Sequence, residues 1–298
     1  MADYILSCES TVDLPYSYVS GRNIPVLFYS YQVDGQVYED DMMRHEDGLE
    51  KFYKNIYAGK IPSTSQLNQA EYEAFFEELL QKADVLHLVF GSGMTSSIRN
   101  AIAAAETVRP KFPDRRLIVI DTTCSCCGYG LFVDMAADIR DEGASIDELA
   151  AWVNANYLRI HHQFFTTDLQ YFRRSGRMSG SAAMLGTILN ICPIMRLDRA
   201  GRIRAYDKVR GKKNAIRRTL SEMEAHAVDG LNYAGKCFIG HSDCPEDAAE
   251  MKKAIEERFL HLAEEVRIYN IGTIIASHCG PNTVSVYFLG DERWDDKE

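Results

Sequence analysis

Small hydroxyl side chains gather at three places in the first third of the chain. Ser10-Thr11 follows a predicted strand, Ser63-Thr64-Ser65-Gln66 precedes a predicted helix, and Ser92 with Thr95-Ser96-Ser97 separates a buried strand from a helix. In an open α/β sheet, ligands bind at the loops beyond the carboxyl ends of the strands. Hydroxyls and the free N–H groups of a helix N-terminus suit a carboxylate or phosphate. Each segment alone is more typical of ordinary N-capping, but the three together favour a shared anion site.

A histidine near the C-terminus is a further candidate. His278 lies in His278-Cys279-Gly280-Pro281, after an apolar run, Thr273–Ala276, that we predict to be a strand. At a Gly-Pro turn it could donate a hydrogen bond to an anion, although a purely structural role is the commoner one.

A serine hydrolase is the alternative enzymatic interpretation. Ser92 sits on a tight predicted turn, and the order Ser92, an aspartate, then His278 is that of α/β-hydrolases. Against it, Phe90-Gly91-Ser92-Gly93-Met94 is not G-x-S-x-G, and no aspartate is marked out as the partner of the histidine.

Signatures of cofactor chemistry are missing. There is no G-x-x-x-x-G-K-[ST] loop, Gly128-Tyr129-Gly130 lacks the remaining glycine of a dinucleotide turn, and there is no H-E-x-x-H helix. Cys124-Ser125-Cys126-Cys127 has no second half at metal-ligand spacing, so we expect packed thiols. We therefore predict no cofactor and no metal.

Composition sets the class of protein. The 298 residues are 46% hydrophobic and 26% charged, which is typical of a soluble globular protein. The net charge of −10 argues against nucleic acid and membrane surfaces as partners. The N-terminal residues lack the pattern of a signal peptide, and no apolar run is long enough to span a membrane. We expect a cytoplasmic protein with free thiols.

The first half of the chain alternates strands and helices. The predicted strands are Tyr4–Ser7, Ile24–Val33 (ending at an Asp34-Gly35 turn), Val85–Phe90 and Leu117–Asp121. The predicted helices are one capped by Asn68 and Glu71, Ile98–Thr107 and Leu131–Arg140. Such alternation favours a parallel sheet flanked by helices.

The second half favours a mixed or antiparallel sheet. Its predicted strands are Phe164–Thr167, Ile194–Leu197, Ile203–Val209, Cys237–His241, Val266–Tyr269 and Val284–Leu289. Its predicted helices are Ala182–Asn190, Lys213–Ala227 and Asp247–Leu260, and the helix Ser145–Ile160 links the halves. The Ala200-Gly201 turn indicates a hairpin. We predict two α/β domains in close contact, residues 1–160 and 161–298.

A basic segment interrupts this acidic chain. Between Arg196 and Arg218 there are ten Lys or Arg residues and two acids, an excess of +8 in 23 residues. Such a cluster is either a solvated face or a docking surface for an acidic or phosphate-bearing partner. Stacking aromatics do not interleave within Lys212–Arg218, so nucleic acid is disfavoured.

Eight short motifs, in order, resemble those of the DegV family of fatty-acid-binding proteins. The family's T-D-S-T-x-D-L is matched by Cys8–Leu14, its T-S-Q by Thr64–Gln66 and its S-S-x-L-S-G-T by Gly91–Ser97. Its D-S is matched by Asp121-Thr122, its G-G-R-x-S by Ser175–Ser179 and its N-I-x-P-I by Asn190–Ile194. Its V-R-G-K-K is matched by Val209–Lys213 and its H-x-G-P by His278–Pro281.

The resemblance implies a carrier rather than an enzyme. Its members are the lipid-carrying subunits of bacterial fatty acid kinase, and they hold a long-chain fatty acid between two domains. It implies that the carboxylate is bound by Thr64, Ser65, Thr95, Ser96 and His278. It also implies that a separate kinase docks at Arg177, Arg210 and Lys212 and phosphorylates that carboxylate.

The motifs also depart from the family pattern. Cys8 and Glu9 replace Thr and Asp, Gly91 replaces a serine, and Ser96 stands where glycine is usual. Ser96 adds a side chain where the family leaves room, so the head-group geometry is expected to differ.

Overall fold

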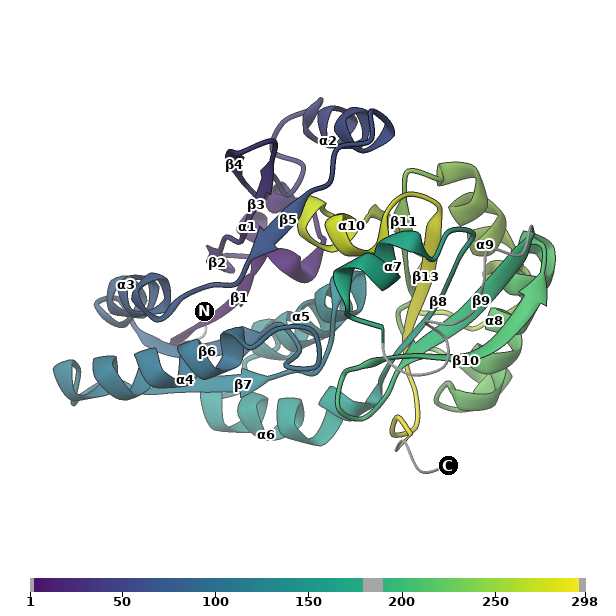
Figure 1. The fold of residues 1–298 in the computed structure, drawn as a ribbon. Coiled ribbons are helices and arrows are strands. Elements are labelled where there is room, and N and C mark those ends of the chain that lie inside the picture. Colours follow the sequence, from purple (N-terminus) through teal and green to yellow (C-terminus); the bar gives the residue numbers. More distant parts are fainter. Residues whose placement is uncertain (1–2, 179–189, 295–298) are drawn as a thin grey trace.

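The protein is described here from a computed structural model that covers residues 3–178 and 190–294. Its N-terminal sheet has four parallel strands in the order β2-β1-β6-β7 (Figure 1). These are β1 (Tyr4–Glu9), β2 (Val26–Leu27), β6 (Asp84–Val89) and β7 (Leu117–Asp121). The predicted parallel sheet is confirmed, and β7 has the predicted bounds.

Five helices accompany this sheet: α1 (Tyr16–Gly21), α3 (Gln69–Leu80), α4 (Ser97–Val108), α5 (Cys126–Asp141) and α6 (Ile146–Asn156). The capping box at the start of α3 is formed as predicted, with Asn68 accepting from the Glu71 N–H and Glu71 accepting from the Asn68 N–H. The predicted start of α5 at Leu131 is wrong. The helix begins at Cys126 and includes both glycines. Gly128 lies so close to the His162 ring that a Cβ would come within 2.4 Å of Nε2, so packing requires a glycine there.

The predicted long strand Ile24–Val33 is also wrong. Only β2 joins the parallel sheet, while β3 (Ser30–Val33) pairs with β4 (Gln36–Glu39) and β5 (Ser63–Ser65) in a separate antiparallel sheet. Asp34 and Gly35 both have positive φ, as a two-residue hairpin turn requires. This tight turn folds the chain back onto β4. Helix α2 (Gly48–Tyr57) lies beside this small sheet in Figure 1.

The second half forms a six-stranded mixed sheet in the order β10-β9-β8-β13-β11-β12. Its strands are β8 (Ile160–Thr166), β9 (Ile191–Leu197), β10 (Ile203–Arg210), β11 (Phe238–Ser242), β12 (Arg267–Asn270) and β13 (Thr283–Leu289). The predicted β9–β10 hairpin is confirmed, and β11–β12 is the parallel pair. Helices α8 (Lys212–His226) and α9 (Pro245–Arg258) pack on this sheet. The predicted helix Ala182–Asn190 lies outside the described residues, apart from Asn190.

The segment predicted as the strand Thr273–Ala276 is instead a helix, α10 (Thr273–Cys279). An apolar run this short is compatible with either structure, and packing decides. Helix α10 contacts β3, β5 and α7 (Gln170–Ser175), so it lies between the small sheet and the second half (Figure 1). Gly280 caps the C-terminal end of this helix with a φ of +67°. A Cβ at this position would collide with the Tyr171 ring, so only glycine fits.

Two buried clusters make up the core. The larger one runs through the parallel sheet, its helices and the side of the six-stranded sheet that faces them. The other lies between the six-stranded sheet and helices α8 and α9. The larger cluster crosses residue 160, so the division into domains at that residue remains a prediction. No helix among the described residues is long and apolar enough to cross a membrane.

Candidate functional site

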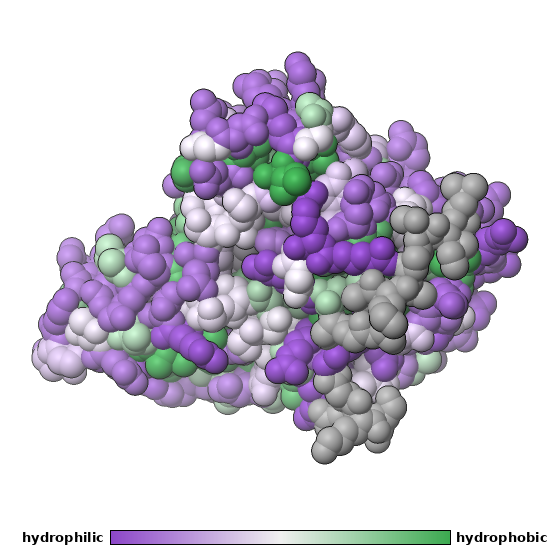
Figure 2. Space-filling view, viewed as in Figure 1, coloured by the Kyte–Doolittle hydropathy of each residue, from purple (hydrophilic) through white to green (hydrophobic). Residues whose placement is uncertain are grey.

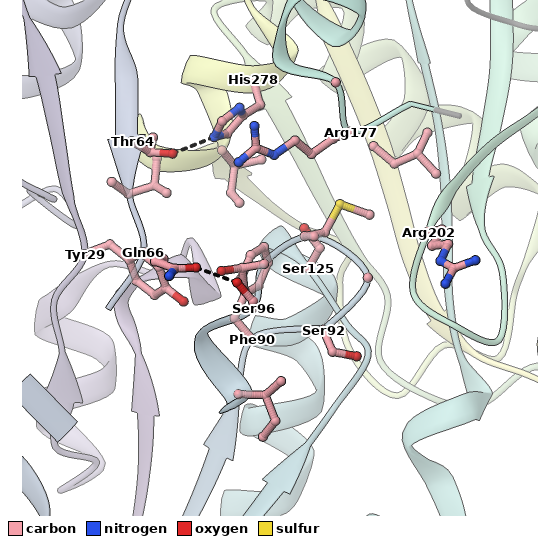
Figure 3. Close-up of a pocket in the computed structure, with 18 of the residues that line it drawn as sticks. Tyr29, Thr64, Gln66, Phe90, Ser92, Ser96, Ser125, Arg177, Arg202 and His278 are labelled. Carbon is pink, nitrogen blue, oxygen red and sulfur yellow. Dashed lines mark hydrogen bonds between the residues drawn. The ribbon is translucent and has the colours of Figure 1, made fainter. Parts of the chain in front are cut away.

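A cavity of about 820 Å³ opens where the small sheet, the β6–α4 loop, α7, α10 and the β9–β10 hairpin meet (Figure 3). All five residues predicted to bind a carboxylate line it: Thr64, Ser65, Thr95, Ser96 and His278. They come from β5, from the β6–α4 loop and from α10, three elements far apart in sequence. The fold therefore brings the predicted residues into one cavity.

The polar side chains of the cavity are already linked to one another. Thr64 Oγ1 and His278 Nε2 are 2.8 Å apart, and this hydrogen bond joins β5 to α10 (Figure 3). Ser96 donates to Gln66 Oε1 at 2.6 Å, which ties the β6–α4 loop to the end of β5. Ser96, which stands where the family pattern has glycine, therefore donates its hydroxyl hydrogen to another residue of the protein. Thr64 is the half-buried hydroxyl at the centre of the group.

His278 is held in its neutral form. Burial, together with the nearby Arg177 and Arg174 guanidinium groups, lowers its pKa to about 4. The neutral ring can either donate to Thr64 Oγ1 or accept from it, and in the tautomer that carries the hydrogen on Nε2 the Thr64 hydroxyl can donate its own hydrogen to a ligand. His278 therefore acts here as a neutral hydrogen-bonding group near neutral pH.

The charge of the cavity favours an anion. Its lining includes Arg99, Arg177 and Arg202, and no aspartate or glutamate is among the described residues that line it. Arg177 and Arg202 face the cavity from the second half of the chain in Figure 3. In a chain of net charge −10, this is a locally positive site.

The cavity continues into a narrower extension of about 60 Å³. The two parts share six lining residues: Met94, Ser125, Phe172, Ile203, Ile275 and Cys279. Beyond them the extension passes over the face of the six-stranded sheet, past Phe164 and Leu197. The site thus combines a wide polar part with a narrow part that suits a chain-like apolar group. None of the residues that line the narrow part was predicted, because residues that line an apolar tunnel have the same composition as residues packed in a core.

Sequence reasoning also missed a buried carboxylate behind the site. Glu9 is fully buried, accepts from the Phe90 N–H at 2.9 Å, and accepts from the hydroxyls of Tyr72 and Tyr29. Tyr29 and Phe90 line the cavity. Glu9, another departure from the family pattern, therefore fixes two residues of the cavity wall.

The pair proposed for a serine hydrolase is not assembled. Ser92 and His278 both line the cavity, but they lie on opposite sides of it in Figure 3. The ring of His278 bonds to Thr64, and among the described residues no hydrogen bond joins it to Ser92 or to an aspartate. Asp121 accepts instead from the backbone N–H of Ser92 at 3.1 Å.

The predicted docking residues lie in different settings. Arg177 lines the cavity, whereas Arg210 is exposed on β10 and Lys212 forms an ion pair with Asp247 at the start of α8. Within the basic segment, Arg218 pairs with Asp207 at 2.8 Å. Acids outside the segment (Asp247, Glu222 and Glu292) pair with Lys212, Arg218 and Arg199, so part of the excess of +8 is offset within the protein.

The cysteines are all buried free thiols, as predicted. Asp13, Cys126 and Cys127 place one oxygen and two sulfurs within 4.8 Å of one another. Burial raises the pKa of both thiols, and Cys127 donates to the Asp13 carbonyl at 3.7 Å. These three buried residues are the group that could hold a metal ion in the described part of the chain.

Residues 6–291 match the family described as "Uncharacterised protein, DegV family". A DegV domain-containing protein of Clostridium perfringens is 33% identical over 294 residues, which cover 98% of this chain and 99% of that protein. The chain belongs to the DegV family.

Solved DegV structures share the fold. A DegV family protein from Thermus thermophilus, described by its fatty acid binding, matches with a TM-score of 0.84 at 26% identity, over 97% of this chain and 99% of that one. A stearic-acid-binding protein from Eubacterium ventriosum matches with a TM-score of 0.84 at 22% identity, over 96% and 98% of the two chains. The predicted α/β DegV fold, with one parallel and one mixed sheet, is confirmed.

Proposed function

We propose that this DegV protein binds one long-chain fatty acid, with the carboxylate in the wide part of the cavity and the acyl chain in the narrow extension. The observation that carries the proposal is the pairing of these two parts in one continuous site. The wide part offers hydroxyls, a neutral histidine and arginines, and no carboxylate is among the described residues that line it. Fatty acid binding by the T. thermophilus relative supports the same ligand class.

The energetics favour such a ligand. Each methylene taken out of water contributes about 0.8 kcal/mol, so a long chain supplies most of the affinity. A buried carboxylate needs hydrogen-bond donors or it costs several kcal/mol. The Thr64 hydroxyl, positioned by His278, is the first such donor, and Ser65, Thr95 and Ser96 line the same wall.

We propose that the protein is a cytoplasmic carrier and that it holds the fatty acid between two domains, residues 1–160 and 161–298. A separate kinase would phosphorylate the bound carboxylate, because no nucleotide-binding motif is found in the sequence. Arg210, exposed on β10, and Arg177, at the cavity, are the best-placed contacts for that partner. Lys212 is the weaker candidate because Asp247 already neutralises it.

Extraction of the purified protein tests the proposal. Organic solvent should release long acyl chains in near-stoichiometric amount, as measured by mass spectrometry. The delipidated protein should then rebind stearate. Absence of co-purified acyl chains, together with no stearate binding after delipidation, would contradict it. A covalent fluorophosphonate adduct on Ser92 would instead support the hydrolase interpretation.

A further inference from the structure

A small buried cluster of a carboxylate and two thiols lies at the start of α5. Asp13 ends the short helix η1 (Ser10–Val12) after β1, and Cys126 and Cys127 are the first two residues of α5. One Asp13 oxygen and the two sulfurs lie within 4.8 Å of one another, and each residue is at most 4% exposed. The cysteines lack a second Cys or His pair in the sequence, but the fold brings to them an aspartate that lies 114 residues before Cys127.

The two thiols converge although they are neighbours in the sequence. Side chains at adjacent helical positions normally point in different directions. Here Cys126 has a φ of +57°, and its Sγ lies 3.9 Å from that of Cys127. Two thiolates bound to one tetrahedral zinc ion at about 2.3 Å are about 3.8 Å apart. The sulfurs are therefore already spaced as a zinc ion requires.

The Asp13 carboxylate can serve as a third ligand. Neither of its oxygens has a well-formed hydrogen bond within the described part of the chain. The groups that interact with it are the Cys126 thiol, which is a weak donor, and the Gly272 N–H. Asp40, also buried, places a second carboxyl group nearby. Buried carboxylates are usually paired with a cation or bound to a metal, and a zinc ion would supply that positive charge.

We propose that Asp13, Cys126 and Cys127 are three of the ligands of a zinc ion. Sulfur ligands favour zinc over magnesium or calcium, which prefer oxygen. Cys126 also lines the narrow extension, so an ion can reach the cluster through the open cavity. Burial raises the pKa of both thiols, so they keep their protons until zinc displaces them. The inference is independent of fatty acid binding.

Metal titration of the untagged full chain tests this inference. The protein is stripped with a chelator under reducing conditions and titrated with Zn²⁺ against a chromophoric zinc indicator, and one zinc ion per chain is expected. Cys126→Ser and Cys127→Ser each remove a sulfur ligand and should weaken zinc binding at least about a hundredfold. Asp13→Asn keeps the side-chain volume and should weaken it about tenfold or more, because an amide oxygen is a poorer ligand than a carboxylate.

Cobalt gives a second readout that needs no variant. Co²⁺ binds the same kinds of ligand as zinc. In the wild type it should give the visible absorption bands of a tetrahedral site and the near-ultraviolet charge-transfer bands of bound thiolate. Cys237→Ser is the matched control, because Cys237 is an equally buried free thiol in the other core cluster. This substitution should leave the zinc affinity and the cobalt bands unchanged.

Three results would overturn the inference. They are a wild type that takes up neither ion, a cobalt complex without thiolate bands, and a zinc affinity that survives both Cys126→Ser and Cys127→Ser. An equal loss of affinity in Cys237→Ser would also overturn it, because the loss would then follow from any buried thiol. If a serine variant at the cluster fails to fold, the cobalt bands of the wild type decide. None of these results bears on the proposed function.

Discussion

The wide and narrow parts of the cavity are built in different ways. In the wide part, Thr64, Ser96 and His278 come from loops and short elements. Thr64 bonds to His278 across the two halves of the chain, and Ser96 bonds to Gln66 within the first half. In the narrow part, the walls are the face of a six-stranded sheet and two short helices above it. In the proposed complex, the carboxylate would therefore be bound by residues that several elements bring together in the wide part. The acyl chain would lie on the face of a single sheet in the narrow part.

The largest expected effect comes from closing the narrow part. Ile275 is half-buried and lines both parts of the cavity, so Ile275→Trp should fill the entrance to the extension. Excluding about five methylenes costs about 4 kcal/mol, or about a thousandfold in the Kd for stearate. Octanoate, which needs only the entrance, should lose far less. Calorimetry with both acids measures the difference.

Ile102→Trp is the control for that change. Ile102 is exposed on α4 and lines neither part, so stearate binding should be unaffected. Equal losses for octanoate and stearate in Ile275→Trp would mean that the chain does not occupy the extension.

A smaller effect is expected in the wide part. Thr64→Val removes the hydroxyl between His278 and the cavity, and it should weaken stearate binding by about tenfold. Stearyl alcohol, which lacks the carboxylate, should be affected less. Ser63→Ala, on the same strand but outside the cavity lining, serves as the control. If the acid and the alcohol weaken equally, Thr64 supports the fold of the site rather than the carboxylate.

The pH dependence of stability should report the neutral His278. Its pKa is lowered to about 4 in the folded protein by burial and by Arg177 and Arg174, against about 6.5 when unfolded. The unfolded chain therefore binds more protons between these values, so stability is lost as pH falls from 6.5 towards 4. Between pH 7.5 and 5, the Tm of the wild type should fall by about 2 °C more than that of His278→Gln.

Bound fatty acid should reverse this difference. A carboxylate beside His278 favours the protonated ring, so the excess loss of stability at low pH should disappear in the complex. Identical pH profiles of the wild type and His278→Gln without ligand would show that the histidine titrates normally.

The smallest effect on lipid binding is expected outside both parts. Arg210 is exposed on β10, so Arg210→Glu should change the Kd for stearate by less than about twofold. Arg177→Glu, at the cavity, should weaken stearate binding several-fold by placing a negative charge near the carboxylate. Arg210→Glu should slow acyl-phosphate formation by the cognate kinase in a reconstituted assay. Unchanged phosphorylation rates would mean that the exposed charge is only a solvated face.

The regular elements and the wide part of the site were predictable from sequence. The Asn68–Glu71 capping box and the continuous apolar strand β7 are local signals, and they placed α3 and β7 correctly. Local patterns failed where tertiary packing decides. Residues 273–279 became a helix because they pack between the small sheet and the second half. The chain after β2 left the parallel sheet because β3 pairs with β4 and β5 instead.

The narrow part was not predictable for a different reason. Phe172, Ile203 and Ile275 look like core residues in the sequence, and only the three-dimensional structure shows that they border an open space. Motif order identified Thr64, Ser65, Thr95, Ser96 and His278, which all line the wide part, whereas no motif marks the residues that line the narrow part.

Calorimetric titration of the delipidated protein with stearate and with stearyl alcohol tests the central claim most directly. The account predicts one site per chain for the acid, and binding of the acid at least about tenfold tighter than that of the alcohol, because the wide part binds the carboxylate. Absence of saturable binding by stearate, or equal affinity for the acid and the alcohol, would contradict the account.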